Sequence, residues 1–366
     1  MEKNAKIYVA GHTGLVGSAI VKNLQSKGYT NIIGKTIEEL DLKNPMSVKT
    51  FFEYEQPEYV FLAAAKVGGI VANNTYRAEF IYDNLMIQNN IIHQSYLSRV
   101  KKLLFLGSTC IYPKDANQPM KEDELLTNTL EYTNEPYAIA KIAGIKMAES
   151  YNIQYGTNFI SVMPTNLYGP NDNFDLEKSH VLPALIRKIY LGKCLEDNNW
   201  DLIKSDLNKR PIEGVKGTDK QEAILKVFTK YGLINSDKNT NIEIWGSGKP
   251  MREFLWSEEM ADACVHLMEH ISFADIIREQ NLTIGKDEIR NTHINIGTGK
   301  EISIKNLALL IKKVILFNGH LVFNTNKPDG TMQKLTNVDK LHNLGWEHKI
   351  EIEEGVKKLY DWYINN

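Results

Sequence analysis

The sequence contains little cysteine. Three cysteines, Cys110, Cys194 and Cys264, stand far apart in 366 residues. An odd number at such wide spacing excludes a disulfide framework and a CxxC metal site. Scattered thiols are typical of proteins in a reducing cytosol, so we expect a cytoplasmic protein. Since no metal-ligand pattern is evident, we also expect no bound metal ion.

Long hydrophobic runs are also lacking. The longest nearly apolar run, residues 59–72, contains Lys66 and two glycines. It is shorter than the roughly 20 apolar residues that a membrane-spanning helix needs. Residues 6–10 already read as a strand, which leaves no room for a signal peptide before them. We therefore expect no membrane partner.

Neither sign of charge dominates. The chain has 43 Lys and Arg against 45 Asp and Glu, a formal net charge of −2. This balance argues against a nucleic-acid partner bound through a broad basic surface. The hydrophobic fraction of 43% and the charged fraction of 24% are those of a globular protein, and the length suits one large domain or two ordinary ones.

The first half of the chain alternates short apolar runs with amphipathic segments. Such alternation predicts βαβ crossovers and an α/β fold, a Rossmann-type doubly wound parallel sheet. The expected strands are residues 6–10, 31–34, 59–65, 102–107 and 159–164, and the expected helices are 14–27, 46–54, 80–97 and 136–155.

After Pro170 the pattern is looser. We expect helices at 181–191, 258–270 and 303–317, strands at 243–245 and 293–296, and one helix near 224–231. The expected domains are a Rossmann domain of residues 1–168 plus about 254–298, and a smaller discontinuous α/β substrate domain of about 169–253 plus 299–366.

A glycine loop follows the first expected strand. Gly11, Gly14 and Gly17 stand in the spacing GxxGxxG, where glycine permits a turn and a close approach of backbone to phosphate. The start of the following helix offers free N–H donors to an anion. The position of the loop favours a dinucleotide site over an ordinary turn.

The end of the second strand indicates which dinucleotide binds. Lys35 follows Gly34, and no acidic residue occurs before Glu38. A basic residue suits the 2′-phosphate of NADP, whereas an acidic one would suit NAD. A solvated surface lysine is the alternative. Asp41, followed by Leu42, could reach an adenine amine or simply mark the start of a helix.

Tyr137 and Lys141 form a YxxxK pair on one face of an expected helix. A nearby ammonium favours the phenolate, so we expect Lys141 to lower the pKa of Tyr137. Ser108 ends the fourth strand at the carboxyl edge of the sheet, where its hydroxyl can hold a carbonyl that Tyr137 protonates. Glycine loop, serine and YxxxK in this order predict a reductase.

Longer and more particular stretches follow the same order along the chain. They are AAAKVGGI (63–70) with Asn73 and Asn74, GSTCIYP (107–113), NEPYAIAK (134–141), MPTNLYGP (163–170), SHV (179–181), GSGKPMREF (246–254) and KPDG (327–330). With them, most of the chain resembles the GDP-L-fucose synthases, a branch of the extended short-chain dehydrogenase/reductase family.

The resemblance implies NADP(H)-dependent chemistry on a GDP-4-keto-6-deoxy sugar, in which C3 and C5 are epimerised and the C4 ketone is reduced. It implies Ser108, Tyr137 and Lys141 as reductive residues, Cys110 as the epimerising base and His180 as the acid. A thiolate and an imidazole suit these roles. Outside the motif each would read as structural.

The resemblance also implies the binding residues and a homodimer formed through helices near 80–97 and 136–155. GDP-sugar contacts are implied for Lys188, Trp245, Arg252, Lys327 and Asp329. Cofactor contacts are implied for Gly11, Thr13, Gly14, Leu15, Val16, Gly17, Lys35, Asp41, Leu42, Ala64, Leu106, Tyr137, Lys141, Pro164, Asn166, Leu167 and His180.

Two features depart from the family pattern. Thr13 stands where these synthases commonly carry arginine. Residues 196–241 form an unusual insertion, and 274–291 also looks extended; we expect both in the substrate half, as surface decoration or as a remodelled pocket for a larger sugar such as a heptose. A C4 reductase without epimerase activity is therefore an open alternative.

More distant alternatives fit less well. A 4,6-dehydratase would carry an acidic pair where Thr109 and Cys110 stand, and a simple 4-epimerase would lack the pair Cys110 and His180. A nonenzymatic NADP-sensing module would have no need of Ser108, Tyr137 and Lys141.

Overall fold

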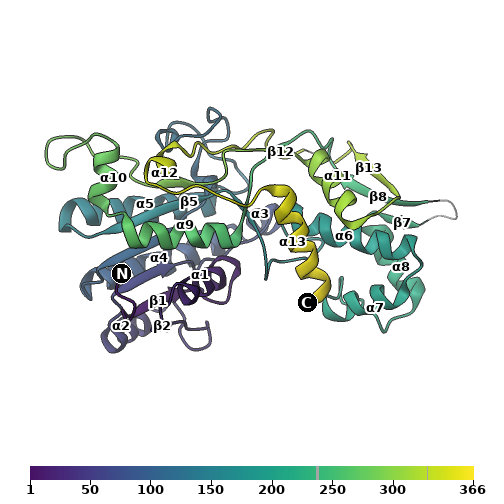
Figure 1. Cartoon of the computed structure of the whole chain (residues 1–366), viewed down its shortest axis with the longest axis horizontal. Helices are drawn as coiled ribbons and strands as arrows, with labels where there is room; N and C mark the ends of the chain where they lie inside the picture. The colour runs from purple at the N-terminus through teal and green to yellow at the C-terminus, as the bar shows by residue number, and fades with distance from the viewer. Residues whose placement is uncertain (236–238, 328) are drawn as a thin grey trace. The chain divides into compact units, whose positions relative to one another are not determined.

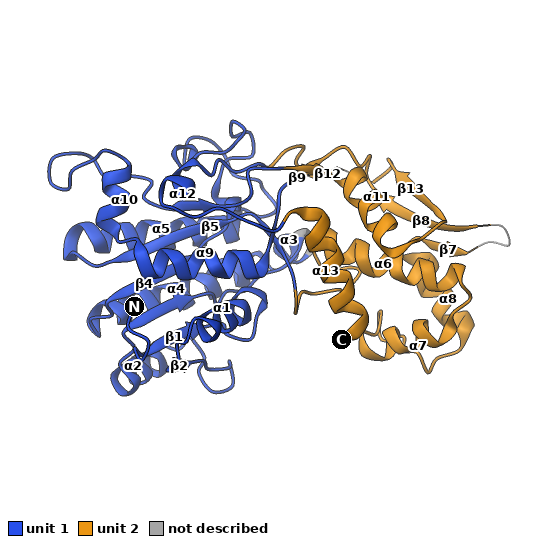
Figure 2. Ribbon diagram, viewed as in Figure 1, with its two compact units in different colours: residues 1–169, 253–300, 335–350 blue, residues 170–252, 301–334, 351–366 orange. Residues whose placement is uncertain are grey.

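The computed structural model describes residues 1–235, 239–327 and 329–366 (Figure 1). The chain divides into two compact units, unit 1 (1–169, 253–300 and 335–350) and unit 2 (170–252, 301–334 and 351–366) (Figure 2). Pro328 of the KPDG stretch and residues 236–238 of the insertion lie outside the described residues. Residues 335–350, expected in the second domain, belong to unit 1 because Leu341 and Trp346 are buried in its core.

Unit 1 is built on a six-stranded parallel sheet in the order β11-β5-β4-β3-β1-β2. The chain moves from β1 outward to β2 and then back past β1 to β3, so the strand order reverses between β1 and β3. This confirms the predicted doubly wound α/β fold. The strands are β1 (Ile7–Ala10), β2 (Ile32–Ile33), β3 (Tyr59–Leu62), β4 (Lys102–Leu106), β5 (Phe159–Pro164) and β11 (Ile294–Ile296).

Helices cover both faces of this sheet (Figure 1). A separate parallel pair, β6 (Asn166–Tyr168) and β10 (Phe254–Trp256), completes the strands of unit 1. Its helices are α1 (Leu15–Ser26), α2 (Pro45–Glu55), α3 (Ile70–Thr75), α4 (Arg77–Leu97), η1 (Thr109–Ile111), η2 (Glu122–Glu124), α5 (Glu135–Tyr155), α9 (Ser257–His270), α10 (Phe273–Glu279) and α12 (Asp339–Asn343).

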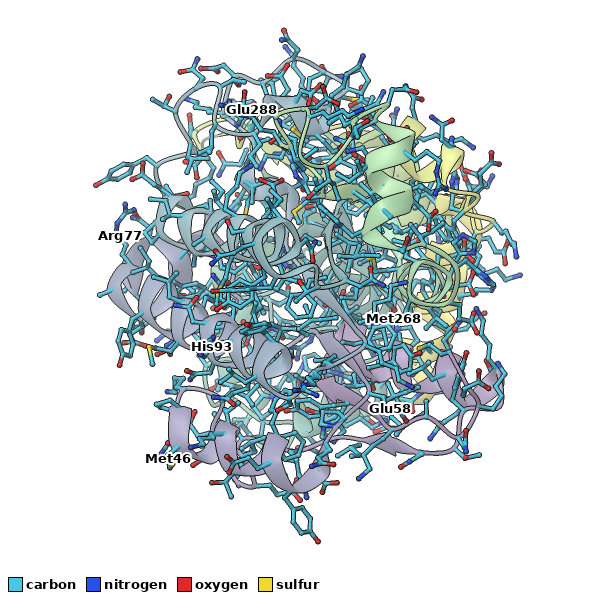
Figure 3. All side chains as sticks on the ribbon, turned by 90° about the vertical axis from the view of Figure 1, so that its left-hand side faces the viewer. Met46, Glu58, Arg77, His93, Met268 and Glu288 are labelled. Atoms are coloured by element: carbon cyan, nitrogen blue, oxygen red, sulfur yellow. The ribbon has the colours of Figure 1, made fainter. Side chains whose placement is uncertain are left out.

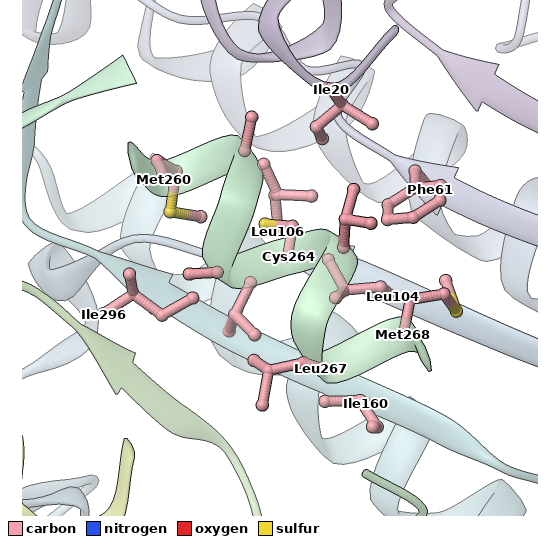
Figure 4. Close-up of a cluster of buried hydrophobic side chains, with 14 of the residues drawn as sticks. Ile20, Phe61, Leu104, Leu106, Ile160, Met260, Cys264, Leu267, Met268 and Ile296 are labelled. Atoms are coloured by element: carbon pink, nitrogen blue, oxygen red, sulfur yellow. The ribbon is translucent and has the colours of Figure 1, made fainter. Parts of the chain in front are cut away.

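Successive strand residues point to opposite faces, so the sheet supplies two apolar clusters. Ile7 and Val9 of β1 belong to the cluster that includes α1 and α9, whereas Tyr8 and Ala10 belong to the cluster beneath α2, α4 and α5. Figure 4 shows the first cluster, in which side chains of β4 and β5 meet those of α9. Cys264 of α9 lies in this core, and burial raises the pKa of its thiol.

Unit 2 is an α/β unit around a three-stranded sheet in the order β13-β8-β7. Its β8 and β13 are parallel, and β7 pairs with β8 in the antiparallel sense. The elements are α6 (Val181–Glu196), α7 (Trp200–Lys209), α8 (Gln221–Lys230), β7 (Leu233–Asn235), β8 (Thr240–Trp245), β9 (Met251–Arg252), β12 (Ile302–Ser303), α11 (Ile304–Ile315), β13 (His320–Asn324) and α13 (Ile352–Asn365).

The predicted insertion supplies part of the core of unit 2. The sequence predicts one helix there, whereas the structure has α7, α8, β7 and the start of β8. Ile203 and Leu207 of α7, and Ile224 and Phe228 of α8, are fully buried together with Leu191 of α6. The expectation of surface decoration is therefore wrong for the described part of the insertion.

A buried ion pair joins α7 to α6. Arg187, 1% exposed, donates through Nε and Nη2 to one oxygen of Asp206 at 3.1 and 2.9 Å. The hydroxyl of Tyr363 in α13 donates to the other oxygen of Asp206, and Nη1 of Arg187 donates to the carbonyl of Phe174 at 3.2 Å. Because neither charge can remain buried without the other, α7 is an integral part of unit 2.

The second expected extension, residues 274–291, lies in unit 1 and not in the substrate half. It begins as α10, whose N-terminus carries a capping box between Ser272 and Asp275. Ile276 of α10 is buried in the core of unit 1, which is the reason that this segment belongs there.

Among the helices of residues 1–235, 239–327 and 329–366, none is both long and apolar enough to cross a membrane. Within the same ranges, no group of three or more His, Cys, Asp or Glu side chains could hold a metal ion.

Glu253 joins three segments of unit 1 that are distant in the sequence. Its fully buried carboxylate accepts from the N–H groups of Thr298 and Gly299 at 2.6 and 2.8 Å. The other carboxylate oxygen accepts from the N–H and the hydroxyl of Thr336 at 2.9 and 2.6 Å. Each of the three segments stands next to a boundary between unit 1 and unit 2 in the chain.

We predict that Glu253→Gln lowers the free energy of unfolding by about 2–4 kcal/mol, because an amide NH2 would face donors that need acceptors. Urea unfolding measures this. The control is Glu288→Gln, since Glu288 is exposed on the same unit (Figure 3); it should change the free energy by less than about 0.5 kcal/mol. Equal effects of the two substitutions would contradict this role of Glu253.

Candidate active site

The glycine loop joins β1 to α1. Gly11 has a φ of 83°, and a Cβ there would lie 2.7 Å from the N atom of Ala64. A Cβ on Gly17 would lie 2.0 Å from the carbonyl oxygen of Gly11. The packing of the protein itself therefore requires both glycines.

Gly14 differs from the other two. A Cβ on Gly14 would have its closest contact at 3.5 Å, so the protein leaves room for a side chain there. Gly14 is the N-cap of α1, and because glycine has no side chain it cannot cap the first amides of the helix. Open amides and open space in front of a helix N-terminus fit the pyrophosphate of a dinucleotide. Exposed Thr13 precedes Gly14, and Leu15 and Val16 begin α1.

Lys35 lies two residues beyond the end of β2, after Gly34. Its ammonium is 3.7 Å from the carboxylate of Glu39, and its side chain is about one-third exposed. Asp41 does not begin a helix: its carboxylate accepts from the N–H of Lys43 at 3.0 Å, and Asn44 caps α2. Leu42 packs against the core. Lys35 is thus the cation that stands nearest in sequence to the end of β2.

Four further predicted cofactor residues lie at the carboxyl ends of the central strands. Leu106 ends β4, Pro164 ends β5, and Asn166 and Leu167 begin β6. The Asn166 amide donates to the carbonyl of Glu253 at 2.8 Å. Ligands of doubly wound sheets bind at this edge, so the structure brings these residues to the expected end of unit 1.

Tyr137 and Lys141 lie on successive turns of α5. The ammonium of Lys141 donates to the carbonyl oxygen of Leu106 at 2.8 Å and lies 5.6 Å from the centre of the Tyr137 ring. Burial lowers the pKa of Lys141 to about 8, with the charge of Cys110 opposing this change. Lys141 is therefore mostly cationic at pH 7 and held at the end of β4.

The expected lowering of the Tyr137 pKa is wrong for the protein as it stands. Desolvation, and secondly the charge of Cys110, raise the pKa of this phenol. The ammonium of Lys141 is turned to the Leu106 carbonyl, so it does not offset the desolvation. Tyr137 is a neutral phenol and hence a proton donor.

Ser108 and Cys110 stand in the short turn after β4. The hydroxyl oxygen of Ser108 accepts from the N–H of Cys110 at 3.3 Å, and Cys110 is 8% exposed within η1. Cys110 interacts electrostatically with both Tyr137 and Lys141. The structure thus brings four predicted reactive residues of unit 1 into one neighbourhood.

The remaining predicted residues belong to unit 2. His180 is the N-cap of α6, and Lys188 lies two turns further along that helix. The ammonium of Lys188 donates to the carbonyl of Glu243 at 2.5 Å, and desolvation lowers the pKa of Lys188 to about 8.

A second group of unit 2 residues lies at or beyond the ends of β8 and β13. The ammonium of Lys327 lies 5.0 Å from the ring centre of Trp245, whose side chain is 62% exposed. Arg252 donates to the carbonyl of Met251 at 2.7 Å. Both carboxylate oxygens of Asp329 accept from Ser247, at 2.8 and 2.7 Å, so Asp329 holds the loop after Trp245.

Asn84 is a site residue that the sequence did not predict. This buried amide on α4 accepts from the N–H of Lys66 and donates to the carbonyl of Lys66, both at 3.0 Å, and so holds the segment that follows β3 beside Gly11. A polar residue on the apolar side of the predicted 80–97 helix was the available signal.

Comparison with known proteins gives consistent results. The model of the NAD dependent epimerase/dehydratase family matches residues 7–231 and 213–285. GDP-L-fucose synthase 1 of Arabidopsis thaliana is 48% identical over 365 residues, which cover 100% of this chain and 95% of that protein. A GDP-6-OMe-4-keto-L-xylo-heptose reductase from C. jejuni is 47% identical, with a TM-score of 0.90 over 100% of this chain and 99% of that one. MlghC, a GDP-mannoheptose C4 reductase from Campylobacter jejuni with NADP bound, is 46% identical, with a TM-score of 0.85 over 99% of each chain.

We predict that Gly14→Ala preserves stability but weakens dinucleotide binding by about tenfold or more, because the added methyl group occupies space left for phosphate. Gly17→Ala should instead destabilise the fold, since its Cβ would meet the Gly11 carbonyl. Fluorescence titration with NADPH and urea unfolding measure the two effects. Unchanged affinity in Gly14→Ala would remove the loop as a phosphate site.

Proposed function

The chain belongs to the NAD dependent epimerase/dehydratase family, and we propose that it uses NADPH to reduce the C4 ketone of a GDP-4-keto-6-deoxy sugar and epimerises C3 and C5 of that sugar. The observation that carries this proposal is the grouping of Ser108, Cys110, Tyr137 and Lys141 at the end of β4. Serine, tyrosine and lysine suffice for reduction. The thiol of Cys110 beside them is suited to act as the base in epimerisation.

In the reduction, Tyr137 donates its phenolic proton to the ketone oxygen while Ser108 donates a hydrogen bond to the same oxygen. Bound NADPH supplies the hydride that adds to C4. The ketone thereby gains one hydride and one proton and becomes a secondary alcohol. The cation of Lys141 stabilises the phenolate that remains on Tyr137.

In the epimerisation, the ketone acidifies the hydrogens on C3 and C5. Cys110 as thiolate removes such a proton, and the electron pair passes into the C4 carbonyl, which Ser108 and Tyr137 stabilise. His180, whose pKa is lowered by burial, returns a proton in its protonated form to the opposite face of the carbon. Each inversion exchanges one proton and leaves the oxidation state of the sugar unchanged.

Unit 1 is proposed as the NADP-binding domain and unit 2 as the GDP-sugar-binding domain. Lys35 suits the 2′-phosphate of NADP, and no carboxylate follows β2 directly to bind the ribose of NAD. In unit 2, Lys188, Arg252 and Lys327 are cations suited to a diphosphate, and Trp245 presents an indole face suited to a base. Asp329 acts through the loop that it holds.

A heptose is the second candidate substrate. Two relatives whose names give heptose substrates are 46–47% identical to this chain over nearly its whole length. A C4 reductase acting on a GDP-4-keto-6-deoxy-heptose would need only Ser108, Tyr137 and Lys141, whereas an epimerase-reductase acting on the same sugar would also use Cys110 and His180. Exchange at C3 and C5 therefore separates the reductase from the epimerase-reductase, and turnover with each sugar separates the heptose from the hexose.

We also propose a homodimer in a reducing cytosol, where the three buried thiols remain reduced. The two longest helices, α4 and α5, expose large hydrophobic side chains. These residues are Tyr82 and Leu97 on α4, and Ile139, Ile153 and Tyr155 on α5. His93 of α4, labelled in Figure 3, contacts the Tyr151 hydroxyl at 2.8 Å and links the two helices. Ile153→Glu should produce monomers in sedimentation; an already monomeric wild type would contradict the dimer.

NMR of the product formed from GDP-4-keto-6-deoxy-mannose and NADPH in D2O tests the function. Tyr137→Phe should lower reduction by about 100-fold or more and keep cofactor binding; full activity would contradict its role. Cys110→Ser should keep reduction and suppress deuterium at C3 and C5; undiminished exchange would remove Cys110 as the base. Wild-type reduction without exchange would favour the C4-reductase alternative.

The rate of ketone reduction by the wild type should fall above pH about 8, because Lys141 then loses its proton and no longer stabilises the phenolate of Tyr137.

A further inference from the structure

The side chain of Tyr112, in the turn after β4, reaches the edge strand β11. Its hydroxyl donates to the Oδ1 atom of Asn295 at 2.5 Å and lies 3.1 Å from Nε2 of His293. Tyr112 is 3% exposed, and both partners are fully buried. The reactive residues Ser108 and Cys110 stand four and two positions before it.

The hydrogen bonds fix the tautomer of His293. The Tyr112 hydroxyl has a single proton, which Asn295 Oδ1 accepts, so Nε2 of His293 must donate to the hydroxyl oxygen. Nδ1 is then an unprotonated acceptor, which agrees with its lack of a donor among the described residues. Burial and nearby lysines lower the pKa of His293, so the ring remains neutral.

The two partners of the Tyr112 hydroxyl, Asn295 and His293, are themselves held by hydrogen bonds. Asn295 Nδ2 donates to the carbonyl oxygens of Met120 and Asn337 at 3.0 and 3.2 Å, and its N–H donates to buried Glu122 at 3.0 Å. The ammonium of Lys340 donates to the carbonyl of His293 at 3.0 Å. Asn295 is therefore held by three further hydrogen bonds, and the backbone of His293 is held by one.

The hydrogen bonds within the turn of residues 108–112 are long, and Ile111 of this turn is buried in the core of unit 1. Ser108 Oγ accepts from Cys110 N at 3.3 Å, and the N–H of Tyr112 donates to Thr109 at 3.4 Å. β4 holds the turn at its first end, and the Tyr112 side chain holds it at the other. A turn fixed at both ends keeps Ser108 and Cys110 in place beside Tyr137 and Lys141.

We propose that Tyr112, with His293 and Asn295 as its partners, is a positioning residue that sets Ser108 and Cys110 against the Tyr137 and Lys141 pair. The effect on turnover rests on the proposed function, whereas the effect on the Cys110 thiol does not. Both effects can be measured in the full-length protein.

The test compares Tyr112→Phe with Tyr8→Phe. Tyr8 is a matched control because it is fully buried in the same unit and its hydroxyl has no partner among the described residues. Tyr112→Phe should lower kcat for ketone reduction by about tenfold and leave KM for NADPH and sugar within about twofold, because the substrates still bind while the reacting groups are misplaced. Tyr8→Phe should leave kcat unchanged.

Alkylation by iodoacetamide, followed at each cysteine by mass spectrometry, gives a readout that needs no substrate. Tyr112→Phe should increase the alkylation rate of Cys110 by about threefold or more through loosening of the turn, with buried Cys194 and Cys264 as internal references. If the wild type shows no turnover, the proposed function fails and this measurement still decides the positioning role.

His293→Leu is the second variant, and it decides the matter if Tyr112→Phe does not fold. It removes one partner and keeps the bond to Asn295, so smaller changes of about two- to fivefold are expected in kcat and in Cys110 alkylation. Variants that fold, and whose kcat and Cys110 alkylation match those of Tyr8→Phe, would overturn the proposal. A loss of stability alone would assign Tyr112 a purely structural role.

Discussion

The hydrogen bond from the Lys141 ammonium to the carbonyl oxygen of Leu106 is the constraint on which the site in unit 1 depends. It fastens the first half of α5 to the carboxyl end of β4. Tyr137, one turn earlier on α5, is thereby set beside the turn that carries Ser108 and Cys110. Because the ammonium is buried, its pKa falls to about 8, and the cation can respond to charge that develops on the phenol.

Hydrogen bonds from a buried polar side chain to the backbone also occur elsewhere in unit 1. Asn84 holds the segment after β3, and Glu253 holds the segments that contain Thr298 and Thr336. Such contacts are costly to break because an unpaired buried polar group remains. They give irregular segments the rigidity that strands and helices have from their own ladders, and a proton-transfer site needs that rigidity.

The sequence predicts what local chemistry determines and misses what distant contacts determine. The glycine spacing, the YxxxK pair and the alternation of strands give the sheet of unit 1 and place Tyr137 and Lys141 on α5. The Tyr137 pKa was mispredicted because the Leu106 carbonyl, a partner 35 positions from Lys141, takes the ammonium. The insertion was mispredicted because the bond between Arg187 and Asp206, which makes α7 part of unit 2, has no local signature. The roles of His180, Lys188 and Arg252 came from family resemblance alone.

The most direct test of the central claim follows a labelled hydrogen from cofactor to sugar. Wild-type protein is incubated in H2O with NADPH deuterated at C4 of the nicotinamide and with a GDP-4-keto-6-deoxy sugar, and the product is examined by NMR. Reduction predicts deuterium at C4 of the sugar and at no other carbon, with one NADPH consumed for each product molecule. Product formed without deuterium at C4, or no NADPH consumed with either the hexose or the heptose, would contradict the account.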